Sequence, residues 1–340
     1  MKKLVIVTDA WAPQINGVVR VLQAVISELE QGDIKVTVIH AGLFRRMLPL
    51  PFYPEIRFAI FPNRRMRALL ATENPDYIHI ATEASLGMCA RRVCLQEGRT
   101  FTTSYHTNFP AYAEYYFVAG WLVAIIGRYF LRYFHRPSKA VLVSTESLKA
   151  RLEAEGYGNV VVWPFGLDAK TFVRDESRAP ALGLSHPLFV YVGRVAKEKS
   201  VEEFLTTPLP GSKLVIGDGP QRAALERKYQ GEALFVGYKC GQDLIDHLSA
   251  TDVCVFPSRT ETFGLVVLEA LACGLPVAAH DVLGPRDILT SGVDGALDED
   301  LAAAATRCLS LSREDCRATA ERFSWKKSAA VFRSHIETYR

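Results

Sequence analysis

Short apolar runs alternate along the chain with longer segments of helical periodicity. In the first half these runs lie at residues 4–7, 36–40, 77–80, 101–104 and 141–144. They are rich in β-branched and aromatic residues, as is typical of buried strands in a parallel sheet. Between the first two runs, residues 18–30 repeat apolar side chains every three or four positions, which predicts a helix.

The same rhythm starts again in the second half of the chain. The runs there lie at residues 188–192, 213–216, 234–236, 253–256 and 276–279. Two successive series of strand–helix alternation predict an α/β protein with two Rossmann-like domains. A length of 340 residues also exceeds what one hydrophobic core usually organises. We expect the first domain over residues 1–166 and the second over 167–324.

Composition narrows the class of protein and its compartment. Hydrophobic residues make up 49%, charged residues 23%, and the net charge is +3, which excludes a disordered chain and wholesale polyanion binding. The seven cysteines form no C-x-x-C pair, which favours reduced core thiols and a reducing cytoplasm. Asp9 interrupts the first apolar run, and the longest uncharged apolar stretch, residues 115–127, is shorter than a membrane span. We expect a cytoplasmic protein, either soluble or peripheral on the inner face of the plasma membrane.

The most informative segment is SRTETFGLVVLEALACGLPV at residues 258–277. A short loop carries Glu261, and the apolar pattern predicts that a helix starts around Gly264. The backbone N–H groups of Phe263, Gly264 and Leu265 would then lie at the helix N-terminus, where the helix dipole favours an anion. The segment therefore predicts a diphosphate site.

Glu269 follows Glu261 by eight positions and falls inside the predicted helix. An isolated pair at this spacing would be read as a surface glutamate and a helix glutamate. Here the flanking residues, S-R-x-E-x-F-G before and E-A-x-A-x-G-x-P-V after, resemble the E-x7-E motif of family 4 retaining glycosyltransferases. The resemblance implies a GT-B fold, in which two Rossmann-like domains face each other across a cleft. It also implies that Glu261 binds the donor sugar and Glu269 the ribose.

A second segment, YVGRVAKEK at residues 191–199, supports the same family. Arg194 and Lys199 resemble the pair that neutralises the donor diphosphate and stabilises the departing nucleotide. A guanidinium fork and an ammonium group both suit phosphate oxygens. We expect Lys197 to be an ordinary surface cation. The following IGDGP turn resembles a structural G-x-G-P turn of the family, and a nucleotide contact by Asp218 is left open.

The first half carries weaker candidates for the reaction centre. Residues 9–20 resemble the family's first-strand loop, in which Gly17 would allow close approach to the donor. His106 follows a predicted strand at its carboxyl end and resembles a cleft-lining histidine, although a structural histidine is the alternative. Glu83 is a weaker cleft candidate. The resemblance also implies that residues 325–340 form a final helix returning to the first domain.

Other classes of protein and site fit less well. A dehydrogenase needs G-x-G-x-x-G after the first strand, and the chain offers only Gly17 there. The sequence Asp298-Glu299-Asp300 imitates a metal-binding motif, but it precedes an alanine-rich segment and is better explained as a helix start. We therefore expect no metal and no cofactor. A phosphorylase of this fold would need a cofactor lysine in a recognisable setting, and the sequence offers none. A non-catalytic nucleotide-sugar-binding protein, the remaining alternative, should have lost part of this residue set.

Clusters of arginine and aromatic residues bear on the acceptor. Residues 43–67 contain six arginines and five aromatics against one acid. Residues 121–134 are rich in aromatics, and Arg128, Arg132 and Arg136 recur at helical spacing. Such clusters suit an anionic membrane surface and hence a lipid acceptor. Core aromatics with a solvated arginine face are the alternative, and no nucleic-acid-binding motif is visible.

The resemblance spans nearly the whole chain and is nearest to bacterial GDP-mannose-dependent mannosyltransferases and glycolipid-forming enzymes. We therefore predict a retaining, metal-independent hexosyltransferase acting on a lipid, with GDP-mannose as the first donor. UDP-glucose or UDP-glucuronate as donor, and a soluble saccharide or metabolite as acceptor, are the alternatives. Asp287 stands where many relatives carry glutamate near the donor sugar.

Overall fold

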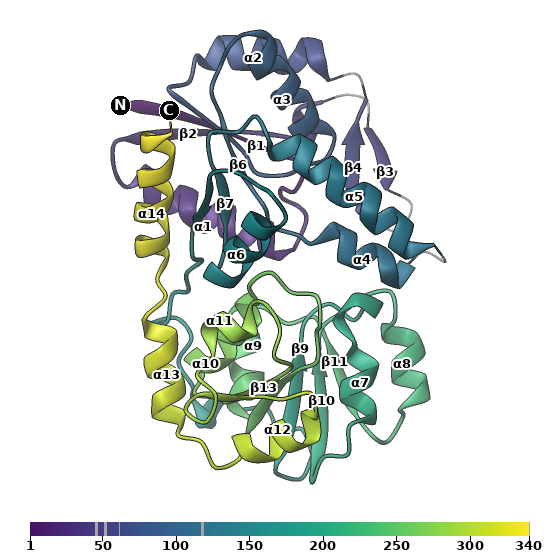
Figure 1. The fold of residues 1–340 in the computed structure, drawn as a ribbon. Helices are drawn as coiled ribbons and strands as arrows, with labels where there is room; N and C mark the ends of the chain where they lie inside the picture. Colours follow the sequence, from purple (N-terminus) through teal and green to yellow (C-terminus); the bar gives the residue numbers. More distant parts are fainter. Residues whose placement is uncertain (45–46, 51–52, 61, 117–118, 340) are drawn as a thin grey trace. The chain divides into compact units, whose positions relative to one another are not determined.

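The computed structural model describes residues 1–44, 47–50, 53–60, 62–116 and 119–339. The chain forms two compact units, the first made of Met1–Gly166 with Trp325–Arg340 and the second of Leu167–Ser324. Each unit contains a six-stranded sheet with helices packed against it (Figure 1). The predicted α/β fold with two Rossmann-like domains is confirmed.

The sheet of the first unit has the strand order β2-β1-β5-β6-β7-β8, and its strand pairs are parallel. Its strands are β1 (Lys2–Thr8), β2 (Ile34–His40), β5 (Tyr77–Ile80), β6 (Thr102–Ser104), β7 (Val141–Val143) and β8 (Val160–Val162). A separate antiparallel hairpin consists of β3 (Met47–Leu50) and β4 (Tyr53–Ala59). The helices are α1 (Gly17–Glu30), α2 (Asn63–Glu73), α3 (Ser85–Gln96), α4 (Phe109–Tyr116), α5 (Gly120–His135), α6 (Glu146–Ala154) and α14 (Trp325–Thr338).

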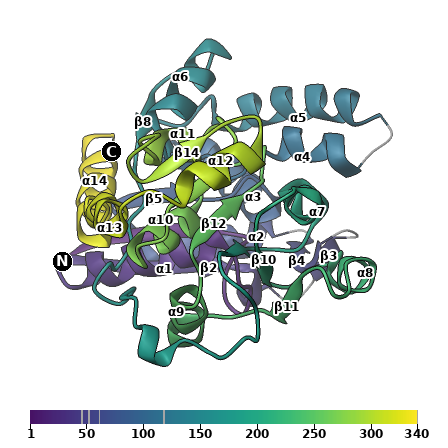
Figure 2. The same cartoon turned by 90° about the horizontal axis from the view of Figure 1, so that it is seen from below.

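The last helix, α14, belongs to the first unit although it follows the second unit in sequence. Trp163, just after β8, is fully buried, and its indole N–H donates to Ser328 Oγ of α14 at 3.0 Å. Phe332 of α14 packs on the same indole, with ring centroids 4.8 Å apart. Helix α14 also lies beside α1 (Figures 1 and 2). Burial of these large aromatic side chains stabilises the return of the chain to the first sheet.

The sheet of the second unit has the order β11-β10-β9-β12-β13-β14, and its strand pairs are also parallel. Its strands are β9 (Leu188–Val192), β10 (Ser212–Ile216), β11 (Leu234–Gly237), β12 (Val253–Phe256), β13 (Val277–Ala279) and β14 (Gly295–Leu297). The helices are α7 (Val201–Thr206), α8 (Arg222–Lys228), α9 (Gly241–Ser249), α10 (Leu265–Ala272), α11 (Pro285–Ile288), α12 (Leu301–Cys308) and α13 (Arg313–Glu321). The strand order therefore reverses between β9 and β12. In such sheets ligands bind outside the carboxyl ends of the strands at this switch point.

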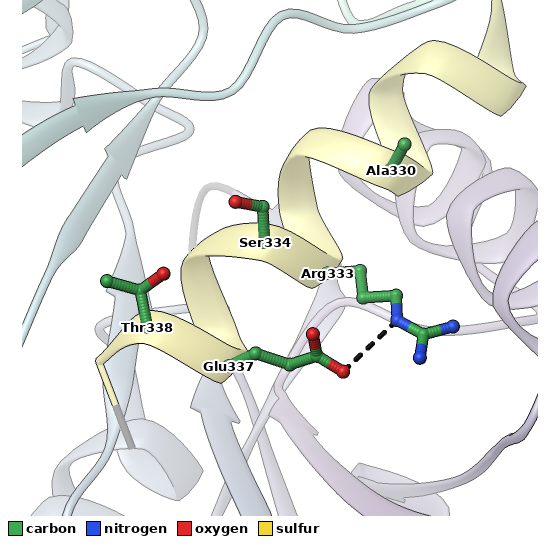
Figure 3. Close-up of a pocket in the computed structure, with 5 residues that line it drawn as sticks. All are labelled: Ala330, Arg333, Ser334, Glu337 and Thr338. Carbon is green, nitrogen blue, oxygen red and sulfur yellow. Dashed lines mark hydrogen bonds and ion pairs between the residues drawn. The ribbon is translucent and has the colours of Figure 1, made fainter.

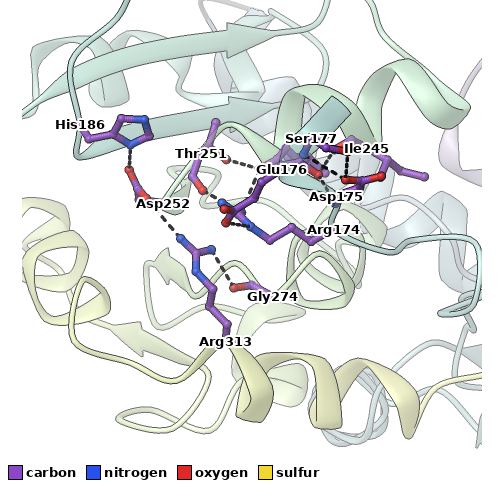
Figure 4. Close-up of polar contacts among 12 residues, drawn as sticks. Arg174, Asp175, Glu176, Ser177, His186, Ile245, Thr251, Asp252, Gly274 and Arg313 are labelled. Carbon is purple, nitrogen blue, oxygen red and sulfur yellow. Dashed lines mark hydrogen bonds and ion pairs between the residues drawn. The ribbon is translucent and has the colours of Figure 1, made fainter. Parts of the chain in front are cut away.

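A polar network fastens the opposite, amino-terminal ends of β9 and β12 (Figure 4). Arg313 donates to Asp252 Oδ1 at 3.2 Å and to the Gly274 carbonyl at 3.3 Å, while His186 Nδ1 lies 2.5 Å from Asp252 Oδ2. Burial would raise the pKa of Asp252, but the Leu188 N–H, His186 and Arg313 together hold it below its ordinary value. The network stabilises the amino-terminal ends of β9 and β12, which lie opposite the carboxyl ends where ligands bind in such sheets.

Two further expectations concern the cysteines and membrane spans. Six of the seven cysteines are buried, all seven are free, and burial raises the pKa of the Cys254 and Cys273 thiols to about 12. The predicted core position of these two thiols is thus confirmed. Among the described residues, none of the helices combines the length and the apolar character that crossing a bilayer requires.

Candidate functional site

The loops after β9 and β12 bring two predicted site residues together at the switch point. Lys199 Nζ lies 2.8 Å from Glu261 Oε2, although the residues are 62 positions apart in sequence. Their side chains are only 20% and 15% exposed, so the ion pair is partly withdrawn from water. At such a position the electric field of both charges is screened less than at the surface.

Hydrogen bonds hold the loop that carries Arg194 and Lys199. The Tyr191 hydroxyl donates to the Arg194 carbonyl at 2.8 Å. Farther along, the carbonyl of Glu198 accepts the hydroxyl of Thr260 at 3.0 Å, which ties this loop to the one that carries Glu261. The backbone on either side of the two cations is therefore fastened to its neighbours. Lys197 is exposed, as predicted for a surface cation.

The loop after β10 packs directly on the loop after β9 through its backbone. The N–H groups of Gly193 and Val195 donate to the carbonyls of Ile216 and Asp218 at 3.0 and 2.9 Å. A Cβ atom built on Gly217 would lie 1.8 Å from the Gly193 carbonyl oxygen, so no side chain fits there. The IGDGP segment is thus a structural turn, as predicted. The carboxylate of Asp218 contacts Arg222 at 3.3 Å, and its contact with a nucleotide stays a prediction.

The N-terminus of α10 lies beside Glu261. Gly264 is the N-cap residue with a φ of 92°, a conformation that favours glycine, and a Cβ built on it would lie 3.6 Å from Glu261 Cγ. Phe263 is buried, and a Cβ on Gly284 would lie 2.6 Å from the Phe263 carbonyl oxygen. Leu265 is the first residue of the helix. The positive end of the helix dipole, a carboxylate and an ammonium group are therefore within one small region, where they can bind an anion and neighbouring hydroxyl groups.

Glu269, the second glutamate of the motif, lies inside α10 and is only 1% exposed. Burial raises the pKa of the Cys273 thiol, and the charge of Glu269 adds a smaller contribution. The Glu269 carboxylate therefore lies close to this buried thiol. The α10 residues from Val267 to Ala272 are all buried, because the helix is covered along most of its length. A contact between Glu269 and a ribose stays a prediction, and it requires this carboxylate to become accessible when the donor binds.

In the first unit, His106 follows β6 and is 9% exposed. Its ring lies 5.8 Å from the Trp163 ring and 5.7 Å from the Phe165 ring, measured between centroids. Burial, assisted by the nearby His135, lowers the pKa of His106 to about 4. The imidazole is therefore neutral near pH 7, so it can donate or accept a hydrogen bond but supplies no positive charge.

The loop after β1, which belongs to the segment that resembles the family's first-strand loop, is anchored by Asp9. The Asp9 carboxylate accepts hydrogen bonds from Ser85 Oγ at 2.9 Å and from the Leu86 N–H at 3.0 Å, at the start of α3. Gly17 is the first residue of α1, and Asn16 caps this helix by accepting the Val19 N–H at 3.0 Å. The distance in sequence between Asp9 and α3 explains why no local pattern identified this contact.

Glu83, the weaker cleft candidate, is buried and paired. Its Oε1 lies 3.3 Å from His135 Nε2, and His135 Nδ1 lies 2.8 Å from the Thr103 hydroxyl on β6. The Thr103 hydroxyl in turn donates to Ser138 Oγ at 3.1 Å. The chain of contacts joins the loop after β5 to the end of α5 and to β6. Glu83 therefore has a structural partner in the first unit.

The arginine and aromatic clusters occupy different elements. In the first cluster, Arg45, Arg46, Phe52 and Phe61 lie outside the described residues, and β3 and β4 form a hairpin there. Arg64, Arg65 and Arg67 are exposed on α2. In the second cluster, most of the aromatic and aliphatic side chains of α5 are exposed to solvent and not packed in a core.

Two other features contribute nothing to this site. Asp300 caps α12 by accepting the Ala302 N–H at 2.9 Å, while Asp298 and Glu299 pair with arginines, as expected of a helix start.

Among the described residues there is no group of three or more His, Cys, Asp or Glu side chains that could hold a metal ion. A hollow on α14, lined by Ala330, Arg333, Ser334, Glu337 and Thr338, contains none of the predicted site residues (Figure 3).

Comparison with known families agrees with this arrangement. Residues 15–171 match the family model described as Glycosyltransferase Family 4, and residues 186–314 match the model described as Glycosyl transferases group 1. The two matches fall on the two units and together span most of the chain.

Individual relatives are more distant. The chain is 32% identical to the sulfoquinovosyl transferase SQD2 of Arabidopsis thaliana. The match covers 74% of this chain but only about half (51%) of the Arabidopsis protein. It is 29% identical to a GDP-mannose-dependent alpha-mannosyltransferase of Mycobacterium tuberculosis, covering 87% of this chain and 83% of the relative. A GDP-mannose-dependent alpha-(1-6)-phosphatidylinositol dimannoside mannosyltransferase of the same species is 28% identical, covering 86% and 82%. Among solved structures, sucrose-phosphate synthase from Thermosynechococcus elongatus superposes with a TM-score of 0.80 at 19% identity, covering 99% of both chains, which shows a shared fold.

Proposed function

The chain belongs to glycosyltransferase family 4 and is a hexosyltransferase, and from this premise we propose that it transfers mannose from GDP-mannose to a lipid, with retention of the anomeric configuration. The donor is suggested by the relatives named as GDP-mannose-dependent enzymes, which align over most of both chains. The lipid acceptor is suggested by the relative whose name specifies phosphatidylinositol dimannoside. A UDP-hexose donor and a soluble acceptor are the alternatives that the experiments below must exclude.

The observation that carries this proposal is the Lys199–Glu261 pair beside the N-terminus of α10. A diphosphate needs concentrated positive charge, and a sugar needs a hydrogen-bond acceptor for its hydroxyl groups. Lys199 and the helix N-terminus supply the first, and Glu261 supplies the second. Arg194, on the same loop as Lys199, adds a guanidinium group for the phosphates.

In the proposed reaction, the bond between the anomeric carbon and the diphosphate breaks while the acceptor hydroxyl forms a new bond to the same carbon. The hydroxyl attacks from the face that the diphosphate leaves, and its proton departs with the diphosphate. Arg194, Lys199 and the amides of Phe263–Leu265 stabilise the negative charge of the leaving group. Their contribution is electrostatic stabilisation and positioning, which needs no covalent intermediate.

Glu269 and His106 limit the mechanisms that are compatible with the site. A glycosidase would need two carboxylates with access to the scissile bond and to water. Glu269 is 1% exposed, which disfavours that chemistry. With its pKa lowered to about 4, His106 is a neutral group. We assign it the role of orienting a donor or acceptor hydroxyl through a hydrogen bond.

A thermal-shift panel of GDP-mannose, UDP-glucose, UDP-glucuronate, GDP and UDP, measured with EDTA present, tests the donor. A ligand at 100 times its Kd stabilises the folded protein by about 2.7 kcal/mol, which raises the melting temperature measurably. We expect shifts with GDP-mannose and GDP, and a smaller shift for GDP-mannose in the Lys199→Ala variant.

The Lys197→Ala variant serves as the control and should respond like the wild type. A shift confined to UDP ligands would replace the GDP-mannose assignment. The complete lack of a shift on folded protein would overturn the donor site. Transfer of labelled mannose into a solvent-extracted lipid fraction then tests the acceptor, and label found only in water-soluble products would favour the alternative.

A further inference from the structure

Helix α5 exposes a continuous apolar face. Of the 18 large apolar side chains that are exposed in the described part of the chain, eight belong to this helix. The largest exposed fractions are those of Trp121, Ile126 and Tyr129, at 65%, 60% and 71%. Soluble proteins rarely leave a contiguous apolar patch of this kind uncovered unless something binds to it.

The other face of the same helix is packed on the first unit. Ala124, Leu131 and Phe134 are buried, at spacings of seven and three residues. Arg91 of α3 donates to the carbonyls of Tyr133 and Phe134 at 2.9 and 3.0 Å, which fixes the end of the helix. The exposed face is therefore presented by a rigid element. Figures 1 and 2 show α4 packed alongside α5.

Charge distinguishes the possible partners of this face. Arg128 and Arg132 on α5 and Arg136 directly after it are exposed, and residues 115–145 contain no aspartate or glutamate. Tryptophan and tyrosine prefer the boundary between water and lipid, and arginines bind lipid phosphates. An uncharged apolar partner would not require this arginine excess. At 16 residues, the helix is too short to span a bilayer but suits lying in its interface.

The chain connects this face directly to His106, the residue proposed to orient a donor or acceptor hydroxyl. His106, α4 and α5 all belong to the single connection between β6 and β7. His135, the last residue of α5, is buried and lies 2.8 Å from Thr103 on β6 and 3.3 Å from Glu83. A surface bound through α5 would thus be held at a fixed place relative to the β6 end that carries His106.

We propose that the exposed face of α5, centred on Trp121, Ile126 and Tyr129 and bordered by Arg128 and Arg136, inserts into the interface of an anionic lipid bilayer. The inference rests on the proposed function, because it explains how a water-insoluble acceptor reaches the enzyme. It adds the partner, an anionic membrane surface, and the residues that bind it. Apolar insertion supplies the affinity, and the arginines supply the preference for anionic lipid.

Vesicle flotation tests the proposal with the full chain, using vesicles of phosphatidylcholine alone or mixed with phosphatidylglycerol. We expect binding to the anionic vesicles and at least about a tenfold weaker partition for the Trp121→Ser, Ile126→Ser double variant. The Arg128→Gln, Arg136→Gln variant should lose the preference for anionic lipid. A Val293→Ser, Leu309→Ser variant removes two exposed apolar side chains of the second unit and should bind like the wild type.

The donor thermal shift, measured on the same proteins, separates this inference from the proposed function. Intact donor binding with no vesicle binding, or with equal binding by the α5 double variant, overturns the inference and leaves the donor proposal standing. Vesicle binding without any donor response overturns the proposed function instead. Sedimentation velocity provides the remaining arm. A lipid-free dimer that the α5 variant dissociates, while vesicle binding is unchanged, would make this face a contact between two copies of the chain.

Discussion

At the scale of single residues, Lys197 and Lys199 form a natural pair for comparison. They lie two positions apart on one loop, but Lys197 is exposed whereas Lys199 contacts Glu261 at 2.8 Å. We expect Lys199→Ala to lower kcat about 100- to 1000-fold, because the departing diphosphate loses a charge aimed at it in a partly water-excluded site. Lys197→Ala should leave kcat unchanged, as measured by release of nucleotide diphosphate. Equal effects of the two substitutions would contradict the role assigned to Lys199.

At the scale of elements, the backbone contact between the loops after β9 and β10 holds Arg194 in place. A Cβ atom at position 217 would lie 1.8 Å from the Gly193 carbonyl oxygen, so Gly217→Ala forces the two loops apart. We expect a loss of about 1–3 kcal/mol in the free energy of unfolding, the usual cost of overpacking. The GDP-mannose thermal shift should also weaken, because the loop carrying Arg194 moves.

Gly231→Ala is the matched control for this change. Gly231 also has a positive φ, 85°, but nothing lies within 4 Å of a Cβ built there. Its substitution therefore measures backbone strain without a steric clash, and such strain typically costs about 1–2 kcal/mol. If Gly217→Ala were no more destabilising than Gly231→Ala, close packing of the two loops would not be what requires glycine at position 217.

At the scale of the whole molecule, two buried neutral histidines make the first unit sensitive to acid. Burial, with a smaller contribution from His106, lowers the pKa of His79 to about 3, and that of His106 is lowered to about 4. The unfolded chain takes up these protons below pH 6.5, whereas the folded unit does not. The free energy of unfolding therefore has its full value above about pH 6.5. It falls by about 1.4 kcal/mol per pH unit for each histidine as the pH drops toward 4.

Tryptophan fluorescence during urea unfolding can measure this effect, because all four tryptophans lie in the first unit. His79 contacts Thr102 and Ser104 through its two ring nitrogens, at 2.9 and 2.7 Å. We expect His79→Gln to be less stable at pH 8 but to show a shallower decline between pH 6 and pH 4. Parallel pH profiles for the variant and the wild type would show that His79 does not bind the proton in question.

Local sequence patterns identified the strands inside each sheet, including the short β6, β7 and β13, but missed the short edge strands β8 and β14. The run at residues 188–192 coincides with β9, and all five of its residues are buried. By contrast, β8 and β14 have three residues each and lie at sheet edges. A three-residue edge strand has too few positions for a periodic signal, and its pairing comes from a neighbour elsewhere in the chain. The β3–β4 hairpin was missed because its segment was interpreted through its arginines.

The sequence by itself determined the two strand–helix series, the glycines and glutamates of the family motif, and the aromatic and basic character of residues 121–136. The tertiary structure alone decided that Lys199 meets Glu261, that Glu269 is buried, and that the apolar side chains of α5 face solvent. Spacing along a chain specifies which residues share one face of one element. Contact between separate loops depends on strand order, and burial depends on which elements cover a face, and both are set by packing between distant segments.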